Sequence, residues 1–538
     1  MSADHKDFHN SRPLDIHLWS NHPEVNEWVN RLWEERMPES VHDKPGGRKP
    51  KGRAKDQFKV LMLDLYVAWL EDPEQLIGVA MDDHAYQSGS RYNELFISWK
   101  LPRIVRAAHE VGLIGLWQGN EMSGLVTRVW PTEYLREHFR SALFSEFDLE
   151  TPTTRECIIL NSGKPEEDEE GDTTEGHQIG KSDLPAKKGQ KTDQRSAKYP
   201  LEYKDTDHPD IPRWRANLRR YNELLRETFI DLGSADRPVV ELSVADPKSK
   251  RKISRVRINQ RSKFVRRVFY RGRWDLGGRL HGGWWQQVPS RYRKDILIDD
   301  QYTVEVDYSG LHVALIHALE GKPLRGDPYE LGSLLYGVRK EDQREDVKNL
   351  VLMAINAETL EGAYQSFQSE RNQEGRFAIS HDTGERVQVT YDFELLKKLI
   401  QAFLERNPIM AKYLGTDQGV KLMRYDGEMA MRLLNYFTDK GIPVLSVHDS
   451  FIVEANQEVQ LIQKMERIAQ EVAGNHEFKL KQDQLSPTVI EHLRRNDPLI
   501  GREIPNYYNK LKQSVVRCKG YRERLIKFKV WRRGINGD

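Results

Sequence analysis

The chain has 538 residues, which is enough for two to four domains and at least one large hydrophobic core. Its formal net charge is only +1, and its two cysteines, Cys157 and Cys518, are too few for a disulfide framework or a zinc cluster. No apolar run reaches membrane-spanning length and the N-terminus is too polar for a signal peptide, so we expect a cytoplasmic protein without a membrane partner.

The small net charge conceals two strongly basic runs. The first extends from Lys248 to Arg273 without an acidic residue, and the second extends from Lys510 to Arg533. Aromatic residues accompany both runs: Phe269, Tyr270, Trp274, Trp284, Trp285, Tyr521, Phe528 and Trp531. Phosphate contacts beside base stacking use this mixture, whereas charge alone is typical of a solvated face. Both interpretations stay open, although for Trp284 and Trp285 we favour a place in the core.

In chain order, residues 1–54 form an N-terminal extension that ends in a basic stretch rich in glycine and proline. Within residues 55–150, apolar spacing predicts helices from Phe58 to Trp69 and from Ile104 to Val111. Two short strands follow over 113–116 and 124–130, with Arg128 on the second strand. Helices followed by a β-hairpin resemble a winged helix, a common DNA-binding module. An ordinary helical scaffold domain is the alternative.

Residues 160–198 are polar and almost free of large apolar side chains, so we expect a disordered linker. A helical, thumb-like connector over 199–257 comes next, with a helix predicted from Arg213 to Leu232. Residues 258–490 carry the motifs described below, and residues 491–538 form a basic C-terminal segment.

The region 258–490 begins with an alternating strand, Thr303 to Tyr308, and ends with a hairpin followed by a helix. Helices are predicted between the strand and the hairpin and after the hairpin: Gly310–Leu319, Asp342–Ala357, Phe393–Leu404, Glu428–Tyr436 and Val459–Val472. The hairpin strands are Val444–Val447 and Phe451–Glu454. We therefore predict an α+β fold, a right-hand palm with helical fingers, preceded by the winged-helix-like domain.

Two aspartates, Asp307 and Asp449, lie at the ends of apolar strands in this region. Each alone is usually a turn residue or a helix cap. Two carboxylates from separate strands, together with the backbone carbonyl of Tyr308, can also bind a pair of Mg²⁺ ions, with Mn²⁺ as a possible substitute. One ion would activate an attacking 3′-hydroxyl, and the other would neutralise the leaving pyrophosphate. We expect Asp307 and Asp449 to be catalytic.

Between the two aspartates, Arg344 and Lys348 lie one helical turn apart, and Leu352 and Asn356 continue the same face. A surface helix with basic residues is the plain interpretation. The functional interpretation has both cations binding the triphosphate, with Lys348 able to protonate the pyrophosphate, and Leu352 and Asn356 beside the base and sugar.

These motifs resemble the family A DNA polymerases and the single-subunit RNA polymerases of phages and mitochondria. Asp307-Tyr308-Ser309 is similar to motif A, Arg344-x3-Lys348 to the charged half of motif B, and His448-Asp449-Ser450-Phe451 to motif C of the RNA enzymes. Gly278-Arg279-Leu280 and Gln286-Gln287-Val288-Pro289 resemble the segment that holds primer and template in the DNA enzymes. The resemblance implies nucleic-acid contacts by Arg279, Gln286, Gln287 and His448.

The chain also departs from these families. His312 replaces the glutamate that excludes ribose in the DNA enzymes, and it would lie near the nucleotide. Asn356 replaces the motif B tyrosine, and Leu352 replaces an aromatic stacking residue. The choice of sugar is therefore open, although the segment before motif A favours deoxynucleotides.

We thus expect a Mg-dependent polymerase that adds nucleotides to a 3′-hydroxyl, most simply in DNA-templated DNA synthesis. Its partners would be a DNA or RNA primer–template and nucleoside triphosphates, while protein partners stay open. An RNA polymerase or primase-like enzyme and a template-independent nucleotidyltransferase are alternatives. A DNA-binding initiator or regulator with a non-catalytic palm is a further alternative.

Overall fold

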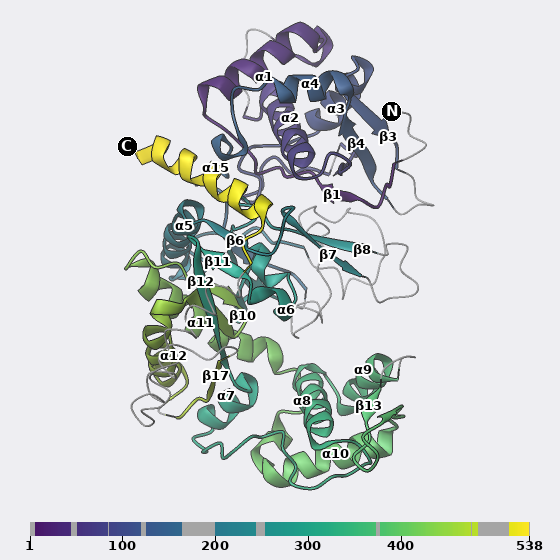
Figure 1. Ribbon diagram of the computed structural model, residues 1–538, viewed down its shortest axis with the longest axis vertical. Coiled ribbons are helices and arrows are strands. Elements are labelled where there is room, and N and C mark those ends of the chain that lie inside the picture. The colour runs from purple at the N-terminus through teal and green to yellow at the C-terminus, as the bar shows by residue number, and fades with distance from the viewer. Residues whose placement is uncertain are drawn as a thin grey trace. The chain divides into compact units, whose positions relative to one another are not determined.

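The computed structural model is a mixed α+β structure of helices and several small sheets (Figure 1). It describes residues 6–44, 51–83, 85–119, 125–163, 199–243, 253–372, 377–474, 476–482 and 516–536. Most of the predicted linker, residues 164–198, and part of the basic C-terminal segment, residues 491–515, lie outside the described residues. Among the described residues, no helix has the length and apolar character needed to cross a membrane.

The chain divides into two compact units. The first unit comprises residues Met1–Arg267, His281–Thr303 and Asn506–Asp538. The second comprises Val268–Leu280 and Val304–Pro505. Strands β9 (Arg266–Tyr270), β10 (Arg273–His281) and β12 (Gln301–Tyr308) each begin in one unit and end in the other.

The N-terminal part of the first unit combines helices with a four-stranded sheet in the order β1-β2-β4-β3. Its elements are β1 (Ser11–Pro13), α1 (Pro23–Arg36), α2 (Ala54–Glu71), β2 (Leu76–Val79), α3 (Lys100–Glu110), β3 (Ile114–Trp117), β4 (Thr127–Pro131) and α4 (Glu133–Arg140). The predicted hairpin is present, because β3 and β4 pair antiparallel with Leu116 opposite Val129. Strands β1 and β2, which periodicity did not reveal, extend it into a sheet.

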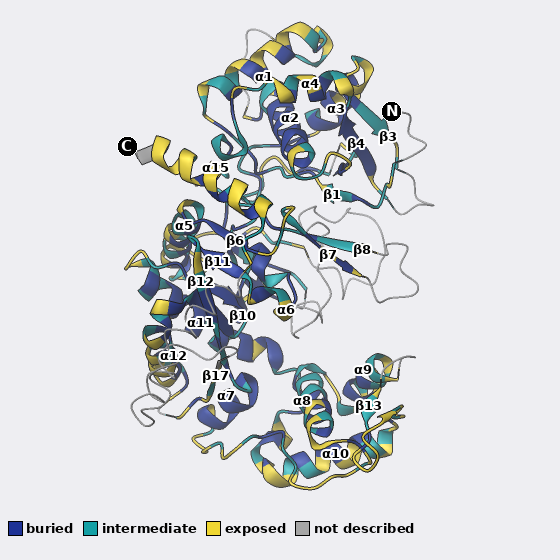
Figure 2. Cartoon of the chain, in the orientation of Figure 1, coloured by how far each residue is buried: buried dark blue, intermediate teal, exposed yellow. Residues whose placement is uncertain are grey.

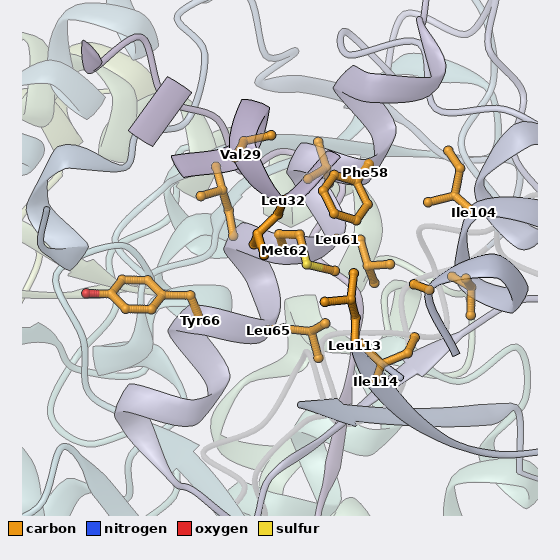
Figure 3. Close-up of a cluster of buried hydrophobic side chains, with 14 of the residues drawn as sticks. Val29, Leu32, Phe58, Leu61, Met62, Leu65, Tyr66, Ile104, Leu113 and Ile114 are labelled. Atoms are coloured by element: carbon orange, nitrogen blue, oxygen red, sulfur yellow. The ribbon is translucent and has the colours of Figure 1, made fainter. Parts of the chain in front are cut away.

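Helix α2 forms the centre of this core because residues on nearly every side of it are apolar and buried (Figures 2 and 3). Phe58, Leu61 and Leu65 of α2 pack with Ile104 of α3 and Leu113 beside β3. Residues Val25, Trp28, Val29, Leu32 and Trp33 of α1 join the same core. The region 1–54 thus contributes a packed helix to this part of the unit.

The remainder of the first unit contains short strands, α5 and the C-terminal helix. Its elements are β5 (Ile158–Leu160), α5 (Ile211–Glu227), β6 (Ile230–Leu232), β7 (Val239–Ser243), β8 (Ile253–Arg257), α6 (Ser290–Arg293), β11 (Ile296–Ile298) and α15 (Lys519–Asn536). The helix predicted over Arg213–Leu232 is too long at its end, since α5 stops at Glu227 and Ile230–Leu232 pairs with β11. A strand replaces the last turn of the predicted helix because pairing with β11 satisfies the backbone N–H and C=O groups of these residues. The spacing of apolar residues carries no information about that partner.

The second unit holds the predicted sequence of strand, helices, hairpin and helix. Its helices are α7 (Leu311–Leu319), α8 (Lys340–Asn356), α9 (Leu360–Arg371), α10 (Phe393–Arg406), α11 (Gly419–Thr438) and α12 (Glu458–Ala473). Its strands besides β12 are β13 (Ala378–Ile379), β14 (Arg386–Val387), β15 (Leu445–Val447), β16 (Ser450–Glu454) and β17 (Leu480–Gln482). Strand β12 lies between β16 and β17, and α12 packs against β16, α7 and α11.

Candidate functional site

In the second unit, Asp307 lies on β12 and Asp449 lies in the turn of the neighbouring β15–β16 hairpin. The hairpin β15–β16 pairs Val447 with Ser450, so His448 and Asp449 form its two-residue turn, and His448 adopts the left-handed region with φ of 55°. The backbone N–H of Tyr308 donates to the carbonyl oxygen of Asp449 over 3.3 Å. The two predicted catalytic residues are therefore brought together by main-chain pairing at the ends of β12 and of the hairpin.

The alternation of β12 decides which face carries Asp307. Val306 and Tyr308 are buried, and the Tyr308 hydroxyl donates to the Met465 carbonyl oxygen in α12 over 2.6 Å. Asp307 lies on the opposite face because successive strand residues alternate. Lys481 of β17 lies directly opposite Asp307 in the register. The polar face of β12 thus carries an acid at its end with a cation beside it.

A third carboxylate, which sequence patterns did not predict, adjoins this pair. Asp426 of α11 is 2% exposed and forms a buried ion pair with Arg279 of β10, which is 4% exposed. The Arg279 Nη2 also donates to Nε2 of His312 over 3.0 Å. Arg279, predicted to touch nucleic acid, and His312, predicted to lie near the nucleotide, are both held inside the unit. Because Arg279 contacts both Asp426 and His312, we infer that Arg279 and His312 together position the Asp426 carboxylate.

Two glycines permit this arrangement. A Cβ on Gly427 would lie 2.0 Å from the carbonyl oxygen of Gly278, so α11 can approach β10 only without a side chain at that position. Gly278 itself has a φ of 94°, a conformation that side chains disfavour. The predicted Gly278-Arg279 segment therefore serves close packing of β10 beside α11.

Burial is the largest influence on the pKa of Asp449 and on that of His312. The protein atoms around Asp449, and next the Asp426 carboxylate, raise the pKa of Asp449 to about 6, against the opposing effects of Arg279 and Lys348. Burial, and then the charge of Arg279, lower the pKa of His312 to about 3, so this imidazole is neutral at pH 7. Its Nε2 accepts from Arg279, and its buried Nδ1 has no hydrogen-bond partner within the described part of the chain.

Helix α8 presents the predicted basic face. Arg344, Lys348, Leu352 and Asn356 are all partly exposed. The buried residues of the helix are Gln343, Asp346, Val347, Leu350, Val351, Ala354 and Ile355. The Arg344 Nε donates to Asp327 Oδ2 over 2.6 Å, and its guanidinium lies 5.8 Å from the centroid of the Tyr329 ring. The charge of Lys348 reaches Asp449 and lowers its pKa. One of the two predicted phosphate ligands is thus electrostatically coupled to a predicted catalytic acid.

The end of α8 is packed against the start of α11. A Cβ on Gly419 would lie 1.5 Å from Oδ1 of Asn356, so the Asn356 side chain occupies the space that a larger residue would need. Asn356 was predicted to face a sugar, and its Oδ1 is buried without a hydrogen-bond partner among the described residues. Its contacts in this structure are therefore with the protein.

The buried side of α8 is fixed by a carboxylate that the sequence patterns also did not reveal. Asp346 is 4% exposed and accepts hydrogen bonds from the hydroxyls of Tyr336 and Tyr391, the second over 2.6 Å. Arg371 of α9 lies 3.9 Å from its other oxygen. Because three separate segments meet at one side chain, Asp346 sets the orientation of the helix that carries Arg344 and Lys348.

The remaining predicted nucleic-acid ligands lie in the first unit, in and next to the 3₁₀ turn Trp284–Gln286. Gln286 Oε1 accepts from the Gly282 N–H over 3.0 Å, and Gln287 is partly exposed. Trp284 and Trp285 are 1% and 0% exposed, which confirms their place in the core. Phe269 and Tyr270 are fully buried as well, so base stacking on these two rings, left open by the sequence, is wrong.

The donor set near Asp449 suits a hard divalent cation. Carboxylates and a backbone carbonyl are the ligands that Mg²⁺ prefers. Burial and then the Asp426 carboxylate raise the pKa of Asp449 despite Arg279 and Lys348, and a bound cation would oppose that shift. Among the described residues, no cluster of three or more histidine, cysteine or acidic side chains is arranged to hold a metal alone. Asp307, Asp449 and the Tyr308 carbonyl therefore fit metals whose other ligands come from a substrate.

Comparison with known proteins adds no relative. No protein-family model matches the chain, and no curated protein matches it. A functional assignment must therefore come from the residues and their geometry.

One signal for Asp426 was present in the sequence. Leu422, Met423, Met429 and Ala430 form an apolar face at helical spacing, and Asp426 interrupts that face. An acid on the buried side of an amphipathic helix requires a partner, which here is Arg279. No comparable signal identified Asp327 as the partner of Arg344, because Asp327 lies in an irregular connection between α7 and α8.

Proposed function

We propose that the chain is a metal-dependent nucleotidyltransferase that extends a nucleic-acid 3′-hydroxyl, most simply by DNA-templated DNA synthesis. The observation that carries this proposal is the junction of β12 with the β15–β16 turn, where the Tyr308 N–H bonds the Asp449 carbonyl oxygen and thereby places the backbones of Asp307 and Asp449 side by side. A polymerase needs two carboxylates from separate strands beside a triphosphate-binding helix, and the coupling of Lys348 to Asp449 supports the second requirement.

Each residue has a proposed role. Asp307, Asp449 and the Tyr308 carbonyl would hold Mg²⁺, or Mn²⁺ in its place, and the bound ions would lower the pKa of the 3′-hydroxyl and offset charge on the pyrophosphate. Lys348 and Arg344 would bind phosphate oxygens. The hydrogen bond from Arg344 to Asp327 would orient the Arg344 guanidinium for this role. Lys348 would then donate its Nζ proton to the leaving pyrophosphate oxygen. Gln286, Gln287 and His448 would contact the primer–template.

The same proposal extends to the architecture. We assign β12, the β15–β16 hairpin, α11 and α12 to a palm, and α8, α9 and α10 to helical fingers. The N-terminal sheet with α2 and α3 is proposed as a winged-helix-like, duplex-binding domain. Its Arg128 is 7% exposed and donates to the carbonyl oxygens of Val126 and Phe8, so other residues would have to make the DNA contacts.

The choice of sugar distinguishes DNA synthesis from the RNA polymerase and primase alternatives. Deoxynucleotides remain our first proposal. In the families named above, the positions of His312 and Asn356 govern this choice. Here His312 contacts Arg279, and Asn356 contacts Gly419 at the start of α11.

One experiment tests the activity. The purified full-length protein is incubated with primed template, unprimed template or single strands, with Mg²⁺ or Mn²⁺, and with dNTPs or NTPs, and extension is followed on denaturing gels. We expect Asp307→Asn and Asp449→Asn each to lower the extension rate by about 10²–10³-fold or more, the scale for loss of one preorganised catalytic group. Glu405→Gln, an exposed acid on α10, is the matched control and should leave the rate unchanged.

The outcomes separate the alternatives. Extension of unprimed templates with NTPs would favour the primase-like enzyme, and extension without template would favour the terminal transferase. If no combination of nucleic acid, nucleotide and metal gives Asp449-dependent extension while thermal unfolding shows an intact fold, the enzymatic proposal fails. Salt-sensitive DNA binding without synthesis would then support the non-catalytic regulator.

A further inference from the structure

The two basic runs look alike in sequence but differ in the structure. In the described part of the first run, most cations are neutralised by acids of the fold. The ion pairs are Arg255–Glu241, Arg257–Glu71, Arg261–Glu71, Arg271–Asp417 and Arg273–Asp275, at 2.5–3.6 Å. Lys263 and Arg267 are buried at 3% and 0% exposure. The described cations of the first run therefore mainly stabilise the protein.

In the second run, helix α15 has an inward and an outward face. Tyr521, Leu525 and Phe528 are buried against Phe229 and Leu297 of the first unit. Arg524 of this helix bonds the buried Asp231 at 2.7 Å, Arg517 just before the helix bonds Asp300 at 2.8 Å, and the exposed Arg532 lies 3.2 Å from Asp299. We call these three contacts the inward ion pairs. Because Tyr521 and Phe528 are buried, base stacking on these aromatic residues, which the sequence left open, is excluded.

The outward face of α15 carries a different set of cations. Lys529 and Arg533 follow Arg522 by seven and eleven residues, so the three lie on one side of the helix. We call these three residues the outward stripe. All three are exposed, on a helix that Figure 2 draws largely in the colour of exposed residues. Their side chains make no ion pair or hydrogen bond within the described part of the chain. The stripe spans about 16 Å along the helix at 1.5 Å per residue.

We propose that the outward stripe binds the phosphate backbone of nucleic acid. This inference rests on the proposed function in that the ligand would be the primer–template. The exposed surface of α15 is positively charged and so complements phosphate. Lys527 is exposed as well, and Glu523 is the one acidic residue of the described helix. The inward ion pairs hold α15 in place, so the stripe is already ordered before binding.

A protein partner is the less favoured occupant. Helices that dock into protein grooves use an apolar face with anchors at positions i, i+3 or i+4 and i+7. On this face only Ile526 and Val530, at 62% and 65% exposure, are apolar, and the cations surround them. About 16 Å of DNA carries about five phosphates per strand at 3.4 Å spacing, which is enough to meet three cations.

The test is a comparison of DNA binding by full-length variants. Fluorescence anisotropy of a labelled 30-bp duplex, measured over a series of salt concentrations, gives the affinity and its salt dependence. We expect the triple variant R522Q/K529Q/R533Q to bind at least about tenfold more weakly and to reduce the slope of log K against log salt by about 0.9 per lost contact, up to about 2.7. The variant R522K/R533K retains the charges and should retain the binding.

A second triple variant controls for loss of charge in general. R213Q/R219Q/R220Q removes three exposed arginines from α5 in the same unit, and it should leave affinity and slope near the wild-type values. Equal losses in both triple variants, or unchanged binding in R522Q/K529Q/R533Q, would overturn the proposal. Loss of binding to polyglutamate with DNA binding intact would also overturn it, by assigning the stripe to an acidic protein.

The inference can fail separately from the proposed function. Asp449→Asn should abolish extension yet bind the duplex with the wild-type salt slope, because Asp449 lies outside the outward stripe. Asp449-dependent extension together with unchanged binding by R522Q/K529Q/R533Q would reject the stripe and leave the nucleotidyltransferase proposal in place. Thermal unfolding midpoints equal to wild type establish that the substitutions on this exposed face act on binding.

Discussion

At the scale of single residues, the main finding is that the charge of Asp449 is set by its neighbours. Enclosure by protein atoms is the largest cause that raises the pKa of Asp449, the Asp426 carboxylate is the next, and Arg279 and Lys348 lower it. Arg279 also neutralises Asp426 directly. Asp426 and Arg279 are therefore positioning residues, since they act through Asp449 and His312.

This arrangement predicts a pH-dependent affinity for divalent cations. With a pKa of about 6, Asp449 is protonated below that pH and ionised above it, so Mn²⁺ affinity should fall as pH falls through about 6. Asp426→Asn removes a like charge and leaves Arg279 without its anion, so the midpoint should move to lower pH. Isothermal titration with Mn²⁺ between pH 5 and 8 measures both midpoints.

Glu405→Gln on α10 is the control for this measurement and should keep the wild-type midpoint. A midpoint that stays in place or rises in Asp426→Asn would show that Asp426 does not act on Asp449 through its charge.

At the scale of secondary-structure elements, α8 is held on one side so that its other side can meet a ligand. Asp346 accepts from Tyr336 and Tyr391, which lie before α8 and before α10 respectively. Burial raises the pKa of Asp346, and the two hydroxyl donors oppose that shift. The orientation of Arg344 and Lys348 thus depends on a network on the opposite side of their helix.

Removal of either hydroxyl should loosen this helix. We expect Tyr336→Phe and Tyr391→Phe each to lower the free energy of unfolding of the second unit by about 1.5–3 kcal/mol, the value for hydrogen bonds to a charged group. Hydrogen exchange of α8 amides and urea unfolding measure the effect. Tyr364→Phe is the matched control, because Tyr364 is 4% exposed and makes no hydroxyl hydrogen bond to a described residue; its expected change is within about 0.5 kcal/mol. Equal effects in all three variants would contradict the role of Asp346.

Elements with a local signal were predicted well from sequence. Alternation of apolar and polar residues identified β12, and apolar runs around His448 and Asp449 identified the β15–β16 hairpin. The sequence was therefore enough to place Asp307 and Asp449 at the ends of these elements. Strands of three residues such as β6 and β11 carry too little pattern to be predicted, and pairing defines them: β6 pairs with β11, which also pairs with β12. The partners of Arg279 and Arg344 were also missed, since ion pairs between residues far apart in sequence leave no periodic trace.

At the scale of the whole molecule, the first unit is assembled from three separate stretches of sequence. Its last stretch includes α15, which covers Phe229 and Leu297 and brings Arg524 to Asp231, a residue with 0% exposure. The C-terminal helix is therefore part of the core of a unit whose first two stretches end at Thr303.

Loss of the buried ion pair should destabilise the first unit. Arg524→Met leaves the Asp231 carboxylate buried without its cation, at an expected cost of about 3–5 kcal/mol in the free energy of unfolding. The double variant Asp231→Leu/Arg524→Met should recover much of that loss, because no uncompensated charge remains. Urea unfolding, analysed as two transitions for two units, gives the values.

Arg533→Met on the exposed side of α15 is the control, with an expected change within about 0.5 kcal/mol. A cost for Arg524→Met no larger than that of Arg533→Met would show that the ion pair is not needed in the core.

The assembly of the first unit from three separate stretches of sequence has a consequence for biosynthesis. Domains normally fold as they leave the ribosome, beginning with the N-terminal one. The first unit cannot complete its core until α15 has been translated, whereas every described residue of the second unit has emerged by position 482. Until then, the nascent chain lacks the cover that Tyr521, Leu525 and Phe528 give to Phe229 and Leu297.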